Sequence, residues 1–242
     1  MNLLIDIGNS RLKWACEFGG KLSAQTALFH QQQNWQTQLL NAWQGLSSPE
    51  KVAISCVANP DILQSVIAWA KQLWSNCEIL IAKSQATGFG VKNSYQHPEK
   101  LGVDRWLCLI AARHFYPQAA WIVDCGTAIT VDYIDENGQH GGGLIAPGLT
   151  LMKKSLLQNT AALDFTAQAY QPELANFTDA AIFSGTLYAA VGLIEQALKT
   201  QTAPAVLLLT GGDAKIISSQ LSPSFIIEPD LVLKGLSIFS DS

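Results

Sequence analysis

The chain has 242 residues, of which 48% are hydrophobic and only 14% are charged, and its formal net charge is −4. This length suits one large domain or two of ordinary size, and the composition excludes a disordered tail or scaffold. The slight acidity gives no support to broad nucleic-acid binding, which needs a basic face. Any anionic ligand must therefore be held by local means, such as a metal ion, backbone N–H groups or a few placed cations.

The first half of the chain opens with a meander and then alternates helices and strands. Residues 2–7 and 10–17 form a predicted hairpin with D-I-G-N-S at its turn, and a third strand is expected near 21–28. The segment Q-Q-N-W-Q-T-Q-L-L-N-A-W predicts an amphipathic helix that places Trp35, Leu39 and Trp43 on one face.

The remainder of this half continues as strand, helix, strand and helix. After the strand K-V-A-I-S-C-V, Asn59 is a predicted N-cap with Pro60 at the first helical position, and this helix should run to about Trp74. The strand C-E-I-L-I-A follows, then the glycine-rich loop T-G-F-G-V, and then a helix expected from about Pro98 to Phe115.

At Trp121 the pattern starts again, with a strand, a D-C-G-T turn, a second strand and a third strand that ends at Pro147. Helical segments are expected at roughly 149–159 and 177–199. A strand A-V-L-L-L and a closing helix from Asp230 complete the chain. We interpret this repetition as two similar α/β domains, 1–116 and 117–242, each a mixed sheet flanked by helices, with a cleft between them.

The two turns have the features of a phosphate clamp. In each, an apolar strand runs into an aspartate, Asp6 or Asp124, and glycine and short polar residues follow. Glycine lets an anion approach backbone N–H groups, and Asn9, Ser10 and Thr127 can donate hydrogen bonds to phosphate oxygens. A buried carboxylate is costly unless it is paired, and Mg²⁺ is typically held by one or two carboxylates. Two opposed turns would therefore grip a magnesium-bound polyphosphate.

The plainer interpretation of D-x-G is an ordinary β-turn, since Asp and Gly are common turn residues. One copy favours that interpretation, whereas two copies at matching places favour the clamp. The sequence T-G-G-D at 210–213 is a candidate third element, because a glycine pair can admit adenine or ribose against the backbone. Glycines at strand-to-helix junctions are also common by themselves.

Six motifs occur in the order of one family. Together they resemble the type III pantothenate kinases, bacterial enzymes of the superfamily of acetate and sugar kinases, heat-shock chaperones and actin: D-I-G-N-S-R-L-K at 6–13, G-V-D-R at 102–105, D-C-G-T-A-I-T-V-D at 124–132, G-G-L-I-A-P-G at 142–148, T-x-x-A-I-x-S-G at 178–185 and T-G-G-D-A at 210–214. The resemblance covers nearly the whole chain. It implies two ribonuclease H-like, actin-like domains and the ATP-dependent phosphorylation of pantothenate to 4′-phosphopantothenate, the first step of coenzyme A biosynthesis.

The resemblance also implies roles for individual residues. Mg-ATP would lie along the first turn, with Asp6 binding the metal ion, and Thr127 would contact the phosphates from the other domain. The ATP-binding residues of the first turn would be Asp6, Ile7, Gly8, Asn9, Ser10, Arg11, Leu12 and Lys13. A monovalent cation, K⁺ or NH₄⁺, would bind at Asp124. Pantothenate would contact Tyr95, Gly102, Val103, Asp104, Arg105 and Thr178, with Asp104 as proton acceptor. The family is usually dimeric, with the substrate pocket completed at the subunit interface. This chain departs from many relatives at Phe177, where they have Asn.

The proposed catalytic pair makes chemical sense. Phosphoryl transfer to an alcohol is mostly positioning and charge neutralisation. Asp104, with an ordinary pKa of ~4, is a weak base for an alcohol, which suffices if it orients the hydroxyl and accepts its proton late. Arg105 can pair with the substrate carboxylate. The plainer alternative is a surface or capping ion pair near a helix start, and the family motif favours catalysis over it.

The sequence also predicts the surroundings of two pairs of basic residues. Arg11 and Lys13 alternate on one strand and share a face, and we assign Lys13 to the phosphates. Lys153 and Lys154 are interpreted as a solvated helix face. The five scattered cysteines and the four histidines show neither disulfide nor zinc-ligand spacing.

No basic leader and no apolar run of ~18 residues is recognised, so a cytoplasmic protein with no membrane or nucleic-acid partner is expected. One alternative function is a nucleotide-binding transcriptional accessory protein that lost catalysis, and another is a kinase or phosphatase of the same superfamily with a different substrate. A protein that only binds has no need of the aspartate in G-V-D-R. That motif and the Tyr95 loop favour pantothenate.

Overall fold

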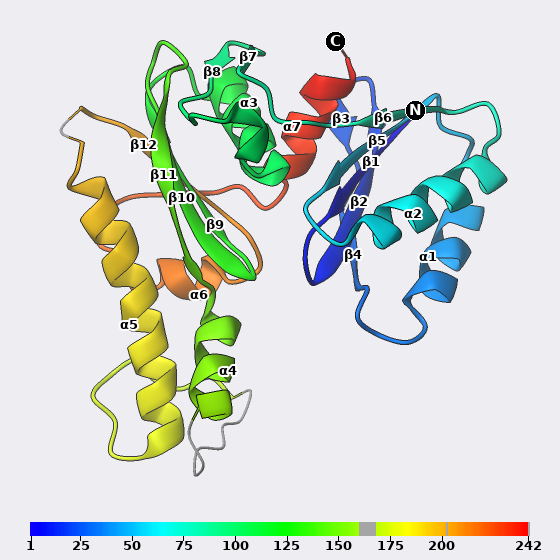
Figure 1. The fold of residues 1–242 in the computed structure, drawn as a ribbon. Coiled ribbons are helices and arrows are strands. Elements are labelled where there is room, and N and C mark those ends of the chain that lie inside the picture. The colour runs from blue at the N-terminus through cyan, green and yellow to red at the C-terminus, as the bar shows by residue number, and fades with distance from the viewer. Residues whose placement is uncertain (160–167, 202, 242) are drawn as a thin grey trace. The chain divides into compact units, whose positions relative to one another are not determined.

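The computed structural model describes residues 1–159, 168–201 and 203–241 (Figure 1). The chain forms two compact units, which are described here one at a time: the first comprises Met1–Pro117, Asn137–His140 and Asp230–Ser242, and the second comprises Gln118–Glu136 and Gly141–Pro229. The predicted domains 1–116 and 117–242 differ from these units because two later segments, residues 137–140 and 230–242, pack with the first unit.

The first unit is built on a mixed sheet with the strand order β3-β2-β1-β5-β6, and β4 also pairs with β2. Strand β1 is antiparallel to β2 and parallel to β5, which is parallel to β6. The strands are β1 (Asn2–Ile7), β2 (Arg11–Phe18), β3 (Lys21–Leu22), β4 (Thr26–Phe29), β5 (Lys51–Cys56) and β6 (Glu78–Ile81). The predicted hairpin is confirmed.

The third strand expected near 21–28 is instead two short strands. Ser23 interrupts the ladder, because its backbone N–H donates to the carbonyl of Cys16 at 2.8 Å and its hydroxyl accepts from the N–H of Cys16 at 3.0 Å.

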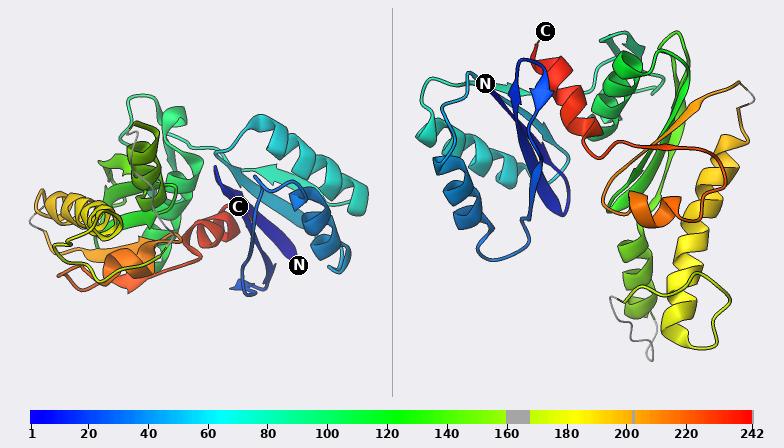
Figure 2. Two further views of the ribbon diagram at one scale, coloured as in Figure 1. Left: turned by 90° about the horizontal axis from the view of Figure 1, so that it is seen from below. Right: turned by 180° about the vertical axis from the view of Figure 1, so that it is seen from behind.

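Helices cover this sheet on two faces. The helices α1 (Trp35–Gln44) and α2 (Pro60–Leu73) pack on one face, in a core cluster that includes Leu3, Ile5 and Ile7 of β1. On the other side lie α3 (Val103–Phe115) and α7 (Leu231–Ser240), which pack against each other, and α7 also contacts β1 and β5 (Figure 2). Because side chains alternate along a strand, Asp6 lies on the face opposite α1 and α2.

Both predicted helices of this face are confirmed in detail. In α1, Trp35, Leu39 and Trp43 are the buried residues, as the amphipathic pattern predicts. Helix α2 begins at the predicted N-cap, where the side chain of Asn59 accepts a hydrogen bond from the N–H of Asp61 at 2.9 Å.

The helix expected from about Pro98 begins later than predicted. The hairpin of β7 (Thr87–Gly88) and β8 (Val91–Lys92) precedes a 3₁₀ turn, η1 (Pro98–Lys100), and α3 starts only at Val103. The interruption arises because Leu101 is buried in an extended conformation and its carbonyl accepts a hydrogen bond from the Ser84 hydroxyl at 2.8 Å. Gly102 then becomes the N-cap of α3.

The second unit repeats the sheet of the first. Its strand order is β11-β10-β9-β12-β13, with β9 antiparallel to β10 and parallel to β12, and β12 parallel to β13. The strands are β9 (Ala120–Cys125), β10 (Ala128–Ile134), β11 (His140–Pro147), β12 (Val206–Thr210) and β13 (Ile226–Ile227). Strand β9 therefore occupies the same place as β1, and each is followed by an antiparallel neighbour and flanked by a parallel one.

The helices of the second unit are α4 (Leu149–Asn159), α5 (Thr178–Leu198) and α6 (Ala214–Ser218). Helices α5 and α6 share a core cluster with Trp121, Val123 and Cys125 of β9. Asp124 alternates with these three residues and so lies on the opposite face of the sheet, as Asp6 does in the first unit.

Helix α5 is long and apolar enough, by length and composition, to span a membrane, contrary to the expectation that no apolar run approaches ~18 residues. Half of its most apolar window is buried within the protein, and it supplies Phe183, Leu187 and Ile194 to the core of the second unit. The central helix of a globular domain has these properties.

Candidate active site

The first turn joins β1 to β2 and carries most of the predicted nucleotide-binding residues. The N–H of Gly8 donates to the carbonyl of Arg11 at 2.9 Å, which closes the turn. Asp6 is only 8% exposed. The side chains of Ile7 and Leu12 are fully buried in the core, so these two residues can offer only main-chain groups to a ligand.

The register of the hairpin distinguishes the two predicted cations. Lys13 lies directly opposite Asp6 in the antiparallel β1–β2 pair, and residues opposite one another share a face of the sheet. Arg11 is exposed, and its guanidinium carbon lies 4.6 Å from the centre of the Phe29 ring. Lys13 is therefore the cation beside the aspartate, whereas Arg11 stacks on a neighbouring strand. Asn9 is exposed and Ser10 is partly exposed at the tip of the turn.

The first turn is supported by a buried histidine, His30, that was not predicted from the sequence. His30 is 9% exposed, and its Nε2 lies 2.7 Å from the carbonyl oxygen of Gly8. The Trp35 ring packs edge-on against this imidazole, with the ring centres 6.2 Å apart. In a planar trans peptide, C=O and N–H point in opposite directions, so fixing the Gly8 carbonyl also fixes the direction of the Asn9 N–H. No local pattern marked His30, since it lies 22 residues from its partner.

The second turn joins β9 to β10 and has the same construction. Asp124 is the fifth residue of its six-residue strand, as Asp6 is in β1. The N–H of Gly126 donates to the carbonyl of Ala128 at 3.1 Å, and the N–H of Gly148 donates to the carbonyl of Thr127 at 2.9 Å. Thr127 itself is exposed.

The predicted third element, T-G-G-D, lies against this second turn. Gly211 has φ +91, and a Cβ atom there would lie 2.5 Å from the carbonyl carbon and oxygen of Cys125 and would overlap a carboxylate oxygen of Asp124. The N–H of Asp213 donates to the carbonyl of Cys125 at 2.9 Å. Only glycine fits at position 211, for reasons of both backbone conformation and space.

The pKa values of two ionisable side chains near this turn, Cys125 and Lys153, are shifted. Burial raises the pKa of the Cys125 thiol, and the carboxylates of Asp124 and Asp213 raise it further. Partial burial lowers the pKa of Lys153, which the Asp213 carboxylate opposes. The Nζ of Lys153 lies 4.8 Å from the centre of the Phe183 ring. The prediction of a solvated lysine pair is therefore wrong for Lys153 and correct for Lys154, which is exposed.

The start of α3 presents the predicted catalytic residue. Asp104 is the second residue of the helix, and its Oδ1 accepts a hydrogen bond at 2.8 Å from the N–H of Arg105. The positive end of the helix dipole and this hydrogen bond both favour an ionised carboxylate. A Cβ atom on Gly102 would lie 2.6 Å from the same oxygen, so the glycine leaves room for the side chain of Asp104.

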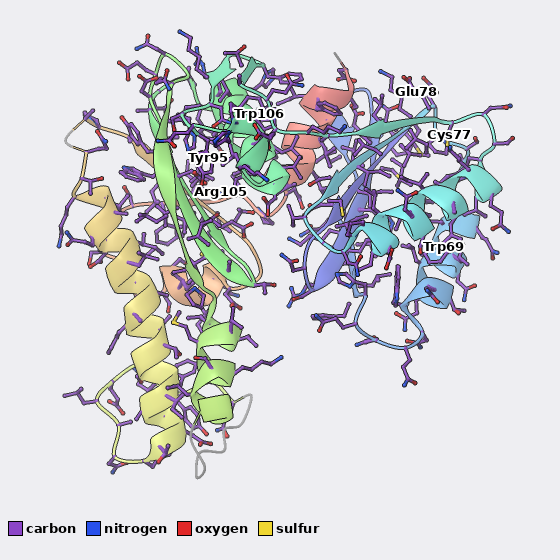
Figure 3. All side chains as sticks on the ribbon, in the orientation of Figure 1. Trp69, Cys77, Glu78, Tyr95, Arg105 and Trp106 are labelled. Carbon is purple, nitrogen blue, oxygen red and sulfur yellow. The ribbon has the colours of Figure 1, made fainter. Side chains whose placement is uncertain are left out.

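Arg105 and Tyr95, predicted from separate motifs, lie in contact (Figure 3). Arg105 is 5% exposed, and its Nη1 donates to the Tyr95 hydroxyl at 2.6 Å. Its guanidinium carbon lies 5.4 Å from the centre of the tyrosine ring. A guanidinium is the side-chain group that pairs bidentately with planar carboxylates, so Arg105 has the chemistry that a substrate carboxylate requires.

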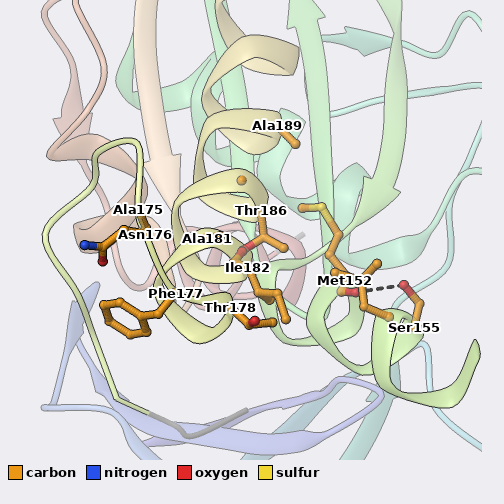
Figure 4. A pocket seen from close by; sticks show the side chains of 12 residues that line it. Met152, Ser155, Ala175, Asn176, Phe177, Thr178, Ala181, Ile182, Thr186 and Ala189 are labelled. Atoms are coloured by element: carbon orange, nitrogen blue, oxygen red, sulfur yellow. Dashed lines mark hydrogen bonds between the residues drawn. The ribbon is translucent and has the colours of Figure 1, made fainter. Parts of the chain in front are cut away.

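Thr178 lies in the second unit, at the rim of an open cavity of about 890 Å³ between α4, α5 and the segment before α5 (Figure 4). Met152, Phe177 and Ile182 also line this cavity. Phe177 takes the N-cap position of α5 without a side-chain hydrogen bond to the helix, and its ring packs against Tyr170 with 5.4 Å between the ring centres. The N-cap position of α5 thus carries an aromatic contact in place of the side-chain hydrogen bond that a capping residue supplies.

Three pairs of predicted residues are therefore neighbours, and each pair lies inside one of the two units. Lys13 is brought beside Asp6, Gly211 beside Asp124, and Tyr95 beside Arg105. Asp6 and Asp124 belong to different units, so the cleft between them stays a prediction. In the part of the chain that the structure describes, no three His, Cys, Asp or Glu side chains gather into a metal site.

Comparison with known proteins assigns the chain to a family. Residues 2–200 match the family of type III pantothenate kinases. A type III pantothenate kinase from Nitrosococcus oceani is 39% identical, and the match covers 98% of this chain and 92% of the relative. Another, from Dichelobacter nodosus, is 37% identical over 98% of this chain and 96% of the relative.

Solved structures support the fold. A Baf family protein from Campylobacter jejuni superposes with a TM-score of 0.65 at 22% identity, covering 99% of this chain and 98% of that one. The activator of 2-hydroxyisocaproyl-CoA dehydratase from Clostridium difficile, solved with bound ADPNP, gives a TM-score of 0.57 at 12% identity, covering 98% and 93%. These likenesses confirm the predicted fold class of two actin-like α/β domains. From the sequence matches over nearly its full length, the chain belongs to the type III pantothenate kinase family.

Proposed function

We propose that this chain transfers the γ-phosphoryl group of ATP to the hydroxyl of pantothenate, giving 4′-phosphopantothenate and ADP in the first step of coenzyme A biosynthesis. The observation that carries the proposal is the match to type III pantothenate kinases over 98% of the chain. Two features support it. Asn9 is exposed at the tip of the first turn and carries a side-chain amide that can donate to a phosphate oxygen, and Arg105 carries the guanidinium that suits a substrate carboxylate.

In this proposal the first turn holds the triphosphate of ATP. The backbone N–H groups and the side chains of Asn9 and Ser10 donate to phosphate oxygens, Lys13 neutralises charge, and Asp6 holds the Mg²⁺ that accompanies the nucleotide. Thr127 donates to the phosphates from the second unit. Lys13 and Asp6 are neighbours across the hairpin, as a shared metal–phosphate site requires.

Asp104 acts on the acceptor in this scheme. The hydroxyl oxygen of pantothenate forms a bond to the γ-phosphorus while the bond from that phosphorus to the bridging oxygen of ADP breaks, and the hydroxyl proton passes to the Asp104 carboxylate. Gly102 and Val103 contribute the backbone beside the substrate. Arg105 and Tyr95 orient its carboxylate end. Asp104 lies in the first turn of α3, where the positive end of the helix dipole favours a negatively charged side chain.

Asp124 is proposed to hold a monovalent cation, K⁺ or NH₄⁺, which would offset charge near the phosphates. The site fits a hard cation, because the carboxylate lies among the glycines 126 and 211, whose missing Cβ atoms leave backbone close to its oxygens. Rates measured in K⁺, NH₄⁺ and Na⁺ buffers test this role. Equal rates in all three would contradict it.

The active enzyme is proposed to be a homodimer in which a second copy completes the pantothenate pocket at Thr178. Apolar side chains that line the cavity beside Thr178 are exposed: Leu156 and Phe177 are each more than a third exposed. A second chain would cover this surface. Light scattering on the purified protein tests the dimer, and a monomer at assay concentration would contradict it.

The protein is proposed to work in the cytoplasm, on small molecules, without a membrane or nucleic-acid partner. The alternative, a nucleotide-binding regulator without kinase activity, is not favoured, because the curated relatives are named as kinases and the aspartate of G-V-D-R is retained at the start of α3.

The decisive experiment is a coupled assay with ATP, Mg²⁺, K⁺ and pantothenate. In Asp104→Asn, kcat should fall by about 10²–10⁴, the usual contribution of a general base, while both substrates still bind. Glu99→Gln is the matched control, because Glu99 is an exposed carboxylate on the preceding 3₁₀ turn. Unchanged turnover in Asp104→Asn would remove Asp104 from the mechanism, and an inactive wild type would refute the proposed function.

A further inference from the structure

His140 is a fully buried histidine that none of the roles above uses. Its exposed fraction is 0%, and it ends the short segment Asn137–His140, which packs with the first unit although the chain on both sides of it belongs to the second. Such a residue needs a structural or functional reason, because burying a polar ring costs free energy unless its nitrogens are hydrogen-bonded.

The segment is fixed tightly where it meets the first unit. The N–H of Lys92 donates to the carbonyl of Gly138 at 2.8 Å, and the side-chain amide of Gln139 donates to the carbonyl of Lys92 at 3.3 Å. Gly138 has φ +80, and a Cβ atom there would overlap the carbonyl oxygen of Gly90. The backbone can approach this closely only because residue 138 is glycine, and His140 is thereby placed beside the loop that carries Tyr95.

His140 contacts this loop through its ring. The imidazole stacks on the ring of Tyr95, with 6.0 Å between the ring centres and an angle of 18° between the planes. Its Nδ1 lies 3.3 Å from the hydroxyl of Ser94. The loop backbone is held separately, because the side chain of Asn93 accepts from the N–H of Tyr95 at 3.0 Å and donates to the carbonyl of Pro98 at 3.1 Å.

Tyr95 is therefore constrained in two different ways. Asn93 fixes the backbone of Tyr95. The side-chain torsions of Tyr95 are restrained by the stacked imidazole of His140 and by Arg105, which donates the 2.6 Å hydrogen bond to the phenol oxygen. A tyrosine has two rotatable side-chain bonds, so a stacking partner removes most of its remaining freedom.

We propose that His140 is a positioning residue for pantothenate: its ring holds the Tyr95 side chain against Arg105, so that the two substrate-contacting groups form one preorganised surface. This inference rests on the proposed function, because it is the pantothenate site that the surface serves. His140 does not touch the substrate in this scheme. It acts by removing the entropy cost of ordering Tyr95 at the moment of binding.

The kinetic consequence is specific to one substrate. In His140→Ala and His140→Gln, KM for pantothenate should rise about two- to tenfold, the range expected from the loss of one aromatic stacking contact, while KM for ATP changes less than about twofold. In His140→Phe, a ring is retained without the imidazole nitrogens, and KM for pantothenate should stay near the wild-type value. His114→Ala, which changes an exposed histidine on α3, is the matched control.

A readout without catalysis separates this inference from the proposed function. Nuclear Overhauser effects between the ring of Tyr95 and the side chain of Arg105, identified with Tyr95→Phe, should be present in the wild type and in His140→Phe and weak or absent in His140→Ala and His140→Gln. Thermal melts of each variant establish that it is folded.

The outcomes are distinct. If the wild type phosphorylates pantothenate and every variant keeps its KM for pantothenate, or raises both KM values equally, the inference is overturned and the proposed function stands. If the wild type lacks the activity, the proposed function falls, and the Overhauser pattern alone decides whether His140 positions Tyr95.

Discussion

Replacing Gly211 with alanine tests whether the T-G-G-D element shapes the second turn. The residue has φ +91, a backbone conformation that costs an alanine about 1–3 kcal/mol. The new Cβ would lie 2.5 Å from the carbonyl group of Cys125, and relieving that overlap should cost a further ~1–3 kcal/mol. The sum is about 2–6 kcal/mol, a large part of the ~5–15 kcal/mol that stabilises a typical domain.

The effect should appear in both stability and activity. Urea unfolding should show a lower midpoint in Gly211→Ala than in the wild type, and kinase activity should fall because the Asp124 carboxylate must move away from the new methyl group. Gly192→Ala is the matched control: Gly192 is an exposed residue inside α5 with open space around its Cβ position. That control should gain ~0.5–1 kcal/mol from helix propensity. A Gly211→Ala protein with wild-type stability and activity would refute the reasoning.

Three further predictions concern other parts of the site. In Gly102→Ala, the new Cβ would lie 2.6 Å from Oδ1 of Asp104 and should displace this flexible carboxylate, so kcat should fall at least about tenfold. The free energy of unfolding, measured with urea, should fall by no more than the ~1 kcal/mol of a lost glycine N-cap. An unchanged kcat would contradict this prediction. In His30→Ala, the Gly8 carbonyl loses the imidazole that lies 2.7 Å away, so the first turn is held less firmly. KM for ATP should therefore rise several-fold while KM for pantothenate stays unchanged. Equal changes in both KM values would point to a general loss of structure. Burial raises the pKa of Cys125 above its unfolded value of ~8.5, so the thiol's contribution to the free energy of unfolding is intact below that pH and is lost as the pH rises above it, with a slope of up to ~1.4 kcal/mol per pH unit. In urea titrations at pH 8–10, Cys125→Ala should lack this part of the wild-type pH dependence. Identical slopes in the two proteins would show that burial does not protect the thiol from ionisation.

Local patterns in the sequence determined the repeating units of this protein. The alternation of apolar residues around Asp6 and Asp124 predicted two strand–turn–strand elements, and the structure has both, each with its aspartate at the fifth of six strand positions. The signals are local because a strand's facing pattern and a glycine turn are set by neighbouring residues. The helix cap at Asn59 was predictable for the same reason.

Predictions failed where a contact between distant residues overrides a local preference. The helix expected from Pro98 is interrupted because Leu101 is buried and hydrogen-bonded to Ser84, and the strand expected near 21–28 is divided by the bonds of Ser23 to Cys16. Lys153 was interpreted as solvated because the sequence could not show that it packs over Phe183.

The tertiary structure alone decided which residues support the site. His30 meets Gly8 across 22 positions, and Ser94 meets His140 across 46. Helix α7, although last in the chain, packs with the first unit, where Gly235 allows the close approach of the backbone at Leu107. Side-chain type and local spacing carry the chemistry of a motif, but the partners that hold it in place are chosen by how the sheets and helices pack, and that choice leaves no periodic trace in a single sequence.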